Sequence, residues 1–567
     1  MLQYLEKKWV IVALIATLTY VIFGASLRHD YGLDDSYVLR EIPNREVAFS
    51  DILKPFQTRF DFVDYRPIPV ASFLFEKWLT GETNPQFSHG INLLLYMAIC
   101  LLVFFTIKTF PIEYAHWLAL ATTFIFLAHP SHADVVNNLK SRDNLLSMLF
   151  GLSAVYVSLL QHPRLTLPIR WLLISLLLFL ALISKLDAFG LVYIIPVIHL
   201  IFNREKFIQW LLLFVLLLAV YGLLRNQLMN YLVPITPIEN PIVFTENPLV
   251  QHPGAIPALS MTISTLTAYL KLMVLPNTYR FYYGFNMLPI LPITSVWIIL
   301  QVLIHLSLLG LAVYQWRKNI LITIGIAVFY LSLGYCANLF QPVAGILAVR
   351  YAFFASLGFC MTLAALCLSL LQLPWVQERL QMEKPMKKKS KVIMPKAPLQ
   401  LIYVATAIML FYAPFSYSRT HDWANIFTLL EADMPHLEQS FEANRIAATQ
   451  YINRGSSEPN PQIRNAAFQR ALKYSQQANQ LCPDMIHEQE SEGICYYMLG
   501  MTDSCFNHFA RVRAKFDTTS VGWEMTGDIF LQRGQRDSAI KSYEKVLQLD
   551  RQNEQAQAKL NELNQRP

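Results

Sequence analysis

Eleven long apolar stretches constrain the fold of this chain more than any other feature. Crossing the hydrocarbon core of a bilayer as a helix takes about 20 predominantly apolar residues. Of the 567 residues 54% are hydrophobic and only 15% are charged, which excludes a soluble domain of average composition. The sequence therefore predicts an all-α, polytopic membrane protein with about eleven transmembrane helices. They are expected near residues 9–27, 90–107, 115–129, 144–161, 168–184, 187–202, 207–224, 290–314, 319–339, 350–373 and 398–416.

The basic residues give the expected orientation, because cytoplasmic loops of membrane proteins carry an excess of Lys and Arg. With the N-terminus inside, every inner loop is basic, from Lys108 to the run between Lys384 and Lys396. Residues 258–276 are also apolar, but counting them as a span would reverse the loops that follow. We interpret this segment as a re-entrant or interfacial helix within a long outer loop.

This orientation divides the chain into two expected domains. Residues 1–416 form the transmembrane domain, with a first outer loop at 28–88 and a second at 225–289. Residues 417–567 are polar and emerge on the same side as the outer loops.

The polar C-terminal region contains a repeat of 34 residues. Gly493 recurs as Gly527, Tyr496 as Phe530, Cys505 as Ala539 and Phe509 as Tyr543. Small and large residues at this period are typical of tetratricopeptide units, each a pair of packed helices. One period earlier Ala471 fits and Ser475 does not, so the first unit is expected to be degenerate. The sequence predicts a C-terminal tetratricopeptide α-solenoid.

A pair of neighbouring acids, Asp34 and Asp35, follows the first span in the segment YGLDDSYVLREIP. Two carboxylates at a membrane boundary raise each other's proton affinity, and a low-dielectric neighbourhood raises it further. One of them can therefore act as a base near neutral pH. Taken alone, the pair is more typical of a solvated turn or a helix cap than of a catalytic base.

Further charged residues gather near the outer ends of the spans, where orientation does not call for positive charge. Because a charge at the centre of a span costs about 2.5–3.5 kcal/mol, such residues invite an explanation. They are Asp61, Asp64 and Arg66; His129, His132, Asp134, Arg142 and Asp143; Lys185 and Asp187; and Arg350.

Each of these groups also has a structural interpretation. The two histidines would form caps or hydrogen bonds, or ligate a metal together with Asp134. Arg142 and Asp143 would pair with neighbouring loops, and the long cations would extend to the interface. Taken together, acids and separated cations on one face predict a site for an anionic lipid-linked donor, with a base for an incoming nucleophile.

Several motifs in a fixed order carry a resemblance to a known family. They are YRPIPVASFLFEKW, FSHGINLLLY, HPSHADVVNNLKSRDNLLSMLF, SKLDAFGLVYIIPV, NLFQPVAGILAVRYAFFASLGF and SRTHDWANIFTLL, followed by the repeats. Together they resemble the transmembrane and tetratricopeptide repeat-containing O-mannosyltransferases and their bacterial relatives over nearly the whole chain. The resemblance implies the C-type glycosyltransferase fold. Asp134 and Asp187 stand where glutamate is more usual in that family.

The resemblance also implies a reaction. Mannose would move with inversion from a polyprenyl-phosphate donor to a Ser or Thr hydroxyl of a protein on the outer face. Asp34 or Asp35 would be the catalytic base. The donor phosphate would be held by Arg350, Lys185 and Arg142, with Arg suited to bidentate contacts and Lys to a point charge. The supporting site residues would be Asp64, Arg66, His89, His132, Asp134 and Asp143. No metal or other cofactor is assigned, and a divalent metal is left open.

The expected partners are the polyprenyl-phosphate-linked sugar, a protein acceptor docked by the repeats, and the lipid bilayer, with no nucleic acid. The expected location is a bacterial inner membrane with the repeats in the periplasm, or the endoplasmic reticulum membrane with the repeats in the lumen in a eukaryote. Two other classes stay open. A transporter of lipid-linked sugars would also place charges near one face, although such folds often contain inverted repeats of spans. A non-catalytic scaffold would use the repeats and need no diacid.

Overall fold

The computed structural model describes residues 5–58, 65–186, 189–202, 204–231, 242–372, 396–516 and 518–565. Within these ranges every regular element is a helix, which confirms the all-α prediction. The chain divides into two compact units. The first comprises Met1–Phe281 and Ile290–Leu429, and the second Tyr282–Pro289 and Leu430–Pro567.

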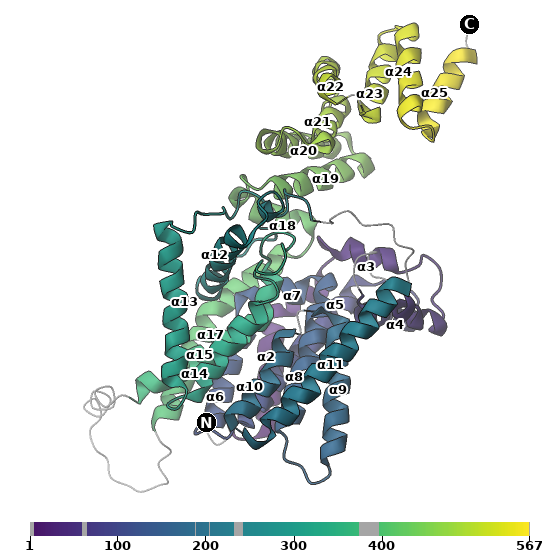
Figure 1. Cartoon of the computed structure of the whole chain (residues 1–567). Helices are drawn as coiled ribbons and strands as arrows, with labels where there is room; N and C mark the ends of the chain where they lie inside the picture. The colour runs from purple at the N-terminus through teal and green to yellow at the C-terminus, as the bar shows by residue number, and fades with distance from the viewer. Residues whose placement is uncertain are drawn as a thin grey trace. The chain divides into compact units, whose positions relative to one another are not determined.

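The first unit is a bundle of long apolar helices (Figure 1). Its α-helices are α2 (Lys8–Phe23), α3 (Asp35–Glu41), α4 (Pro67–Thr80), α5 (Pro85–Lys108), α6 (Ala115–Leu127), α7 (Ala133–Asn137), α8 (Arg142–Leu159), α9 (Leu167–Ser184), α10 (Phe189–Phe202), α11 (Arg204–Tyr231), α12 (Ala255–Val274), α13 (Val296–Gln315), α14 (Ile320–Leu333), α15 (Ala352–Leu371), α17 (Lys396–Asp422) and α18 (Ile426–Asp433). Short 3-10 helices are η1 (Gly24–Arg28), η2 (Phe49–Gln57), η3 (Pro130–His132), η4 (Leu139–Ser141), η6 (Pro248–Val250) and η7 (Val349–Tyr351).

Each of the eleven predicted spans coincides with one of these helices. Seven helices of the described ranges are long and apolar enough to cross a membrane, namely α2 with η1, α5, α9, α11, α13, α15 with η7, and α17. The helices α6, α10 and α14 are shorter and apolar. The one predicted span not yet accounted for, 144–161, coincides with α8. The first turn of α8 carries Arg142 and Asp143 and is therefore less apolar. The segment interpreted as re-entrant or interfacial forms α12, which is not among the seven.

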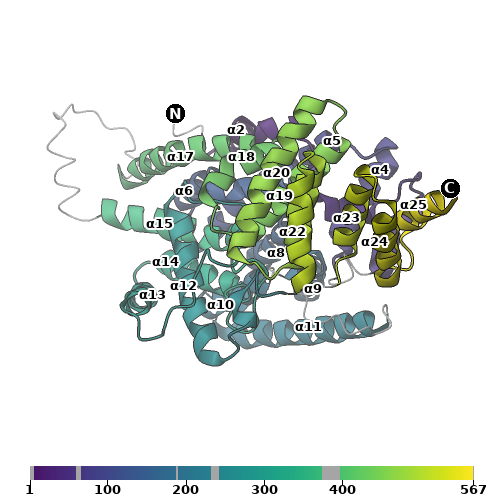
Figure 2. The same ribbon diagram turned by 90° about the horizontal axis from the view of Figure 1, so that it is seen from above.

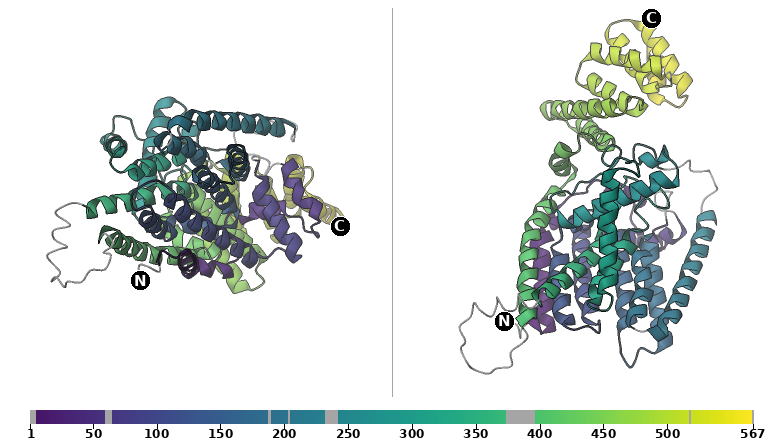
Figure 3. Two further views of the ribbon diagram at one scale, coloured as in Figure 1. Left: turned by 90° about the horizontal axis from the view of Figure 1, so that it is seen from below. Right: turned by 60° about the vertical axis from the view of Figure 1, so that its left-hand side comes forward.

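The helices differ in how deeply they lie in the bundle. About half of the apolar window of α5 and of α15 is buried, but only 11% of that of α13. In Figures 2 and 3, α13 stands at the edge of the bundle and α11 runs obliquely along its periphery. An exposed apolar helix face is expected where lipid rather than protein covers it.

Small residues permit a close helix contact in the bundle interior, between α14 and α15. A Cβ atom built on Gly325 would lie 2.6 Å from the carbonyl oxygen of Gly358, and one built on Gly358 would lie 2.3 Å from that of Gly325. Any larger residue at either position would push the two helices apart. Since lipid tails are as apolar as leucine, such close backbone packing is a main source of helix association in a membrane.

The second unit consists of antiparallel helix pairs. Its elements are η8 (Met434–His436), α19 (Phe441–Ser457), α20 (Pro461–Leu481), α21 (Ile486–Met498), α22 (Thr502–Lys515), α23 (Ser520–Gln532), α24 (Arg536–Leu549) and α25 (Glu554–Gln565). The predicted repeats match α21 with α22 and α23 with α24.

Within each predicted repeat, a glycine of the first helix faces an aromatic ring of the second. A Cβ on Gly493 would lie 2.3 Å from the Phe509 ring, and one on Gly527 would lie 2.8 Å from the Tyr543 ring. The pair α19 and α20 makes the same contact through Gly455 and Phe468. Those two residues do not fall on the 34-residue period, which explains why this unit looked degenerate in sequence. The second unit is a tetratricopeptide solenoid.

Candidate active site

The two neighbouring acids of the first outer loop have different environments. Asp34 precedes α3, and its side chain makes no capping hydrogen bond. Its Oδ2 lies 3.5 Å from the Arg350 guanidinium, and 19% of the side chain is exposed. Asp35 is buried and accepts hydrogen bonds from the backbone N–H of Gly32 at 2.6 Å and of Lys140 at 2.9 Å. Asp34 is thus accessible, whereas Asp35 ties α3 to the segment before α8.

Burial sets the acidity of the inner carboxylate. It raises the pKa of Asp35 to about 6, and the neighbouring charge of Asp34 acts in the same direction. The backbone N–H groups of Gly32 and Lys140 oppose this rise, because they favour the charged form.

A second carboxylate, Asp143 at the start of α8, lies between two cations. Its Oδ2 is 2.5 Å from an Arg66 guanidinium nitrogen, and its Oδ1 is 3.2 Å from Lys185 Nζ. The Lys185 ammonium and the Arg350 guanidinium lie 5.6 and 5.7 Å from the centre of the same Tyr351 ring. The structure thus brings Arg66, Lys185 and Arg350 together around the two carboxylates Asp34 and Asp143.

Lys140 joins this group, and the sequence argument did not identify it. This partly buried residue of η4 interacts electrostatically with Arg350, Asp143, Arg66 and Asp34. Burial lowers the pKa of Lys140 to about 7, and the charge of Arg350 contributes next. The only signal in sequence was a lysine within the motif that also holds Arg142. We call Arg66, Lys140, Lys185 and Arg350, with Asp34 and Asp143, the cation cluster.

Arg142 lies elsewhere, in a closed network that we call the Arg142 cluster. It is fully buried and forms an ion pair with Glu76 of α4. It also donates to Asn92 Oδ1 at 2.8 Å, to Ser72 Oγ at 3.2 Å and to the Ser88 carbonyl at 2.9 Å. Its guanidinium lies 3.7 Å from the centre of the Phe73 ring. Arg142 was expected to bind the donor phosphate. Its position instead favours a structural role, joining α4, α5 and α8.

Two predicted histidines are buried and hydrogen-bonded. His132 Nδ1 lies 2.7 Å from the Tyr96 hydroxyl, and its Nε2 lies 2.7 Å from Ser356 Oγ. His89 Nε2 lies 3.4 Å from the Asp30 carbonyl oxygen. In the described ranges no group of three or more His, Cys, Asp or Glu side chains is arranged to hold a metal ion. Asp64, Asp61 and Asp187 lie outside the described residues.

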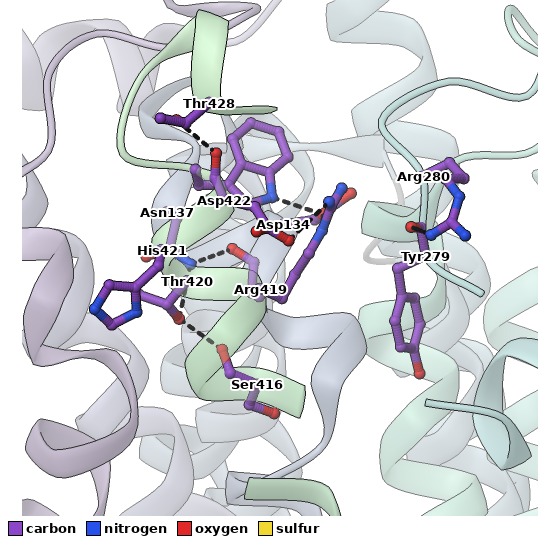
Figure 4. A network of polar contacts seen from close by, with 12 residues as sticks. Asp134, Asn137, Tyr279, Arg280, Ser416, Arg419, Thr420, His421, Asp422 and Thr428 are labelled. Atoms are coloured by element: carbon purple, nitrogen blue, oxygen red, sulfur yellow. Dashed lines mark hydrogen bonds and ion pairs between the residues drawn. The ribbon is translucent and has the colours of Figure 1, made fainter. Parts of the chain in front are cut away.

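Asp134 belongs to a network at the end of the last span (Figure 4). The Trp423 indole donates to Asp134 Oδ1 at 3.0 Å, and Arg419 Nε lies 3.7 Å from the same oxygen. Arg419 also lies 3.4 Å from Asp422 Oδ2. The motif SRTHDW therefore links α17 to α7, and the charge of Asp134 also acts on Arg350 of the cation cluster.

A concavity opens beside Lys185. It measures about 1350 Å³ including the open space at its mouth. Its lining is largely apolar or aromatic and comprises Leu186, Leu218, Tyr221, Gly222, Arg225, Asn226, Tyr335, Phe340 and Gln341. The groove therefore lies between α11 and the segment after α14, one residue along the chain from a member of the cation cluster.

Comparison with curated proteins finds similarity to several protein O-mannosyl-transferases. No protein-family profile matches it. It is 23% identical to protein O-mannosyl-transferase TMTC3 of Mus musculus over 525 residues, 86% of this chain and 52% of that protein. It is 22% identical to TMTC3 of Homo sapiens over 467 residues, 77% of this chain and 47% of that protein. It is 28% identical to TMTC1 of Mus musculus over 151 residues, 25% of this chain and 16% of that protein.

The chain is thus similar in sequence to several protein O-mannosyl-transferases named TMTC3 and TMTC4. The resemblance expected from its motifs is thereby confirmed. The chain spans about half the length, or less, of the curated O-mannosyltransferases that it matches.

A solved structure also aligns with the chain. It is a tetratricopeptide repeat protein of Thermus thermophilus, aligned at 15% identity over 30% of this chain and 90% of its own, with a TM-score of 0.22. The helix pairs and the 34-residue repeat, rather than this alignment, identify the solenoid of this chain.

Proposed function

We propose that the protein is a membrane glycosyltransferase that moves mannose from a polyprenyl-phosphate donor to a Ser or Thr hydroxyl of a protein, with inversion. The observation that carries the proposal is the accessible carboxylate of Asp34 at the edge of the cation cluster. A base and an anion-binding group side by side are what this displacement requires. The names of the relatives support the reaction class.

In the proposed step, the acceptor hydroxyl oxygen bonds to the anomeric carbon while Asp34 accepts the hydroxyl proton. The bond from the anomeric carbon to the phosphate oxygen breaks, and its electron pair leaves with the lipid phosphate. Asp35 is a positioning residue in this scheme, because its two backbone hydrogen bonds hold the turn that carries Asp34.

Lys185, Arg350 and Arg66 would hold the donor phosphate. They come from three separate segments and converge on Asp34 and Asp143. Preorganised cations of this kind stabilise negative charge that builds on the leaving group. Arg142 is omitted from this set, because its guanidinium is buried among Glu76 and neighbouring acceptors.

The lipid tail would occupy the groove that begins at Leu186. Its aliphatic and aromatic lining suits an isoprenoid chain, and its neighbour Lys185 suits the phosphate at the end of that chain. The solenoid would bind the protein acceptor. The reaction would occur on the non-cytoplasmic face of a bacterial inner membrane or of the endoplasmic reticulum, with the repeats on that face.

The test begins with the acceptor. Glycopeptides present in cells with the protein and lost on its deletion are identified by mass spectrometry. One such peptide is then incubated with purified protein and a polyprenyl-phosphate mannose donor. We expect a mannosylated product whose anomeric configuration by NMR is opposite to that of the donor. Glu46→Gln, at an exposed acid of the same outer loop, is the matched control and should transfer normally. No transfer by the wild-type protein to any lost glycopeptide would refute the proposal.

A further inference from the structure

The segment between α14 and η7 carries an exposed aromatic ring. Phe340 is 82% exposed, and no other large apolar side chain of the described residues is more exposed. Such a ring adds little to the core of the protein, but it gains free energy when an apolar ligand covers it. The same segment continues into η7, which holds Arg350 of the cation cluster.

Hydrogen bonds close the base of the tip that presents this ring. Asn338 is buried, and its side-chain oxygen accepts from the Val343 N–H at 2.9 Å and from the Asn247 amide at 2.8 Å. The Asn338 amide nitrogen donates to the Ile346 carbonyl at 2.8 Å. Asn247 also donates to the Val343 carbonyl at 2.8 Å. Residues 339–342 thus form a short closed loop. A ligand that binds such a preorganised tip pays less conformational entropy than one that must order it.

Adjacent residues of this tip face different spaces. Phe340, Tyr335 and Gln341 lie on one wall of the groove that begins at Leu186, opposite α11. Leu339, which is 44% exposed, is not among the described residues that line this groove. It lines a second concavity of about 850 Å³ beside the start of α12, to which Phe340 and Gln341 also contribute. The ring, and not its neighbour Leu339, therefore meets whatever fills the first groove.

The groove connects the ring to the cation cluster. Its first lining residue, Leu186, follows Lys185, whose ammonium lies 3.2 Å from Asp143. A ligand whose phosphate binds at the cations would therefore have its apolar chain in the groove that Phe340 lines. An isoprenoid chain has flat double bonds and methyl branches, which make more contact with the face of an aromatic ring than a flexible saturated chain does.

We propose that Phe340 contacts the isoprenoid chain of the lipid donor and selects it over a saturated chain of the same length. This inference rests on the proposed function and adds a residue that determines lipid specificity. The contact involves the chain and not the bond that breaks, so it acts equally on the bound donor and on the transition state. Phe340 therefore affects donor binding and leaves the chemical step unchanged.

The experiment measures lipid binding separately from sugar transfer. Farnesyl monophosphate and dodecyl phosphate share the phosphate and the main-chain length, and each is titrated by calorimetry into the full-length protein in detergent. The wild type should bind farnesyl monophosphate more tightly. Phe340→Ala should weaken farnesyl monophosphate binding by about 10-fold or more and change dodecyl phosphate binding much less. Phe340→Trp, which keeps a flat ring, should keep the preference.

Leu339→Ala is the matched control, because it removes an exposed apolar side chain from the same tip. It should bind both probes as the wild type does. Thermal unfolding midpoints equal to that of the wild type would show that both alanine variants are folded. Equal losses of farnesyl monophosphate affinity in Leu339→Ala and Phe340→Ala would overturn the inference, because the effect would then belong to the tip as a whole.

Transfer kinetics add a second readout. Phe340→Ala should raise KM for a polyprenyl-phosphate mannose donor by about 10-fold. The value of kcat should change little, as expected for a contact made equally in the ground state and the transition state. A fall in kcat with an unchanged KM would contradict a role in lipid selection.

The outcomes separate the two proposals. Equal affinity of the wild type for the two probes, or an unchanged preference in Phe340→Ala, would overturn the role of Phe340 even if the protein transfers mannose. A preference that is lost in Phe340→Ala, with no transfer by the wild-type protein, would support Phe340 as an isoprenoid contact and refute the proposed transferase activity.

Discussion

The Arg142 cluster and the cation cluster both pair cations with carboxylates, yet they differ in exposure. In the Arg142 cluster, one guanidinium meets one carboxylate, and three further acceptors surround it. The Arg142 side chain is fully buried. In the cation cluster, 19% of the Arg66 side chain, 25% of the Arg350 side chain and 19% of the Asp34 side chain are exposed. The first network is closed, whereas the second has charged groups that a ligand can reach.

This difference distinguishes a structural network from a candidate binding site better than residue type does. A buried ion pair contributes little net stability, but removing one partner is costly because the other charge is left uncompensated. The partly exposed charges of the cation cluster remain in contact with water, so removing one of them, such as Arg350, costs less stability. Variants of the Arg142 cluster should therefore affect folding, and variants of the cation cluster should affect ligand binding and turnover.

The largest expected effect is on turnover, from Asp34→Asn. The amide keeps the shape of the side chain and removes the proton acceptor, so kcat should fall by about 10² to 10⁴-fold. Asp35→Asn should reduce kcat less, because that carboxylate acts on the turn. Transfer to an acceptor verified by mass spectrometry is the measurement. If both variants transfer at the wild-type rate, the diacid is only a feature of the loop.

The next effect is on stability, from Glu76→Gln in the Arg142 cluster. It leaves the buried Arg142 charge without its counter-ion and should destabilise the protein by about 3–5 kcal/mol. Thermal unfolding in detergent measures this. Asp484→Asn, which removes an exposed pair with Lys515, is the control and should cost no more than about 1 kcal/mol. A Glu76→Gln variant of normal stability that fails to bind farnesyl monophosphate would mean that Arg142 serves the ligand after all.

A smaller effect is expected from Arg350→Ala in the cation cluster. Loss of one charged contact should weaken binding of farnesyl monophosphate by about 10- to 100-fold, while the protein still inserts and unfolds at the wild-type temperature. Calorimetry with the folded variant measures it. Unchanged affinity would identify Arg350 as a structural cation that extends to the interface.

Hydropathy alone predicted the eleven spans and α12, because a membrane span must be long, apolar and internally hydrogen-bonded. It did not predict the less apolar or shorter helices α3, α4, α7 and α18. The sequence did not show which charged residues belong to the candidate site and which to a structural network. Arg142 and Lys140 are two positions apart, and the sequence argument chose Arg142. Between them the backbone changes from the 3-10 turn η4 to the first turn of α8, and Arg142 is directed to Glu76 of α4. No pattern in a single sequence specifies that change of direction.

Glu76 illustrates the same limit. It lies on α4 as an ordinary acid in an apolar run, and only the tertiary contact with α8 shows that it is the partner of Arg142. The distinction between Asp34 and Asp35 also depends on tertiary contacts, since the hydrogen bond from Lys140 N–H joins residues 105 positions apart. Sequence identified most of the acids and cations, and packing decided which of them are enclosed in a network and which are partly exposed.

The smallest effect concerns the pH dependence of stability. It tests whether Asp35 has a structural role, as Arg142 does. Its pKa is raised to about 6 by burial, above the value of about 3.9 for an unfolded chain. Between these values the folded state binds more protons than the unfolded state, so stability falls as pH rises. The contribution of Asp35 to stability is therefore fully present below about pH 4 and lost as pH rises through about 6.

Asp35→Asn should remove this decline in stability, which thermal unfolding between pH 4 and 7.5 would record as a few degrees. Glu46→Gln, at an exposed acid of the same loop, should keep it. A decline that persists in Asp35→Asn would assign it to another group and leave Asp35 free to act in catalysis.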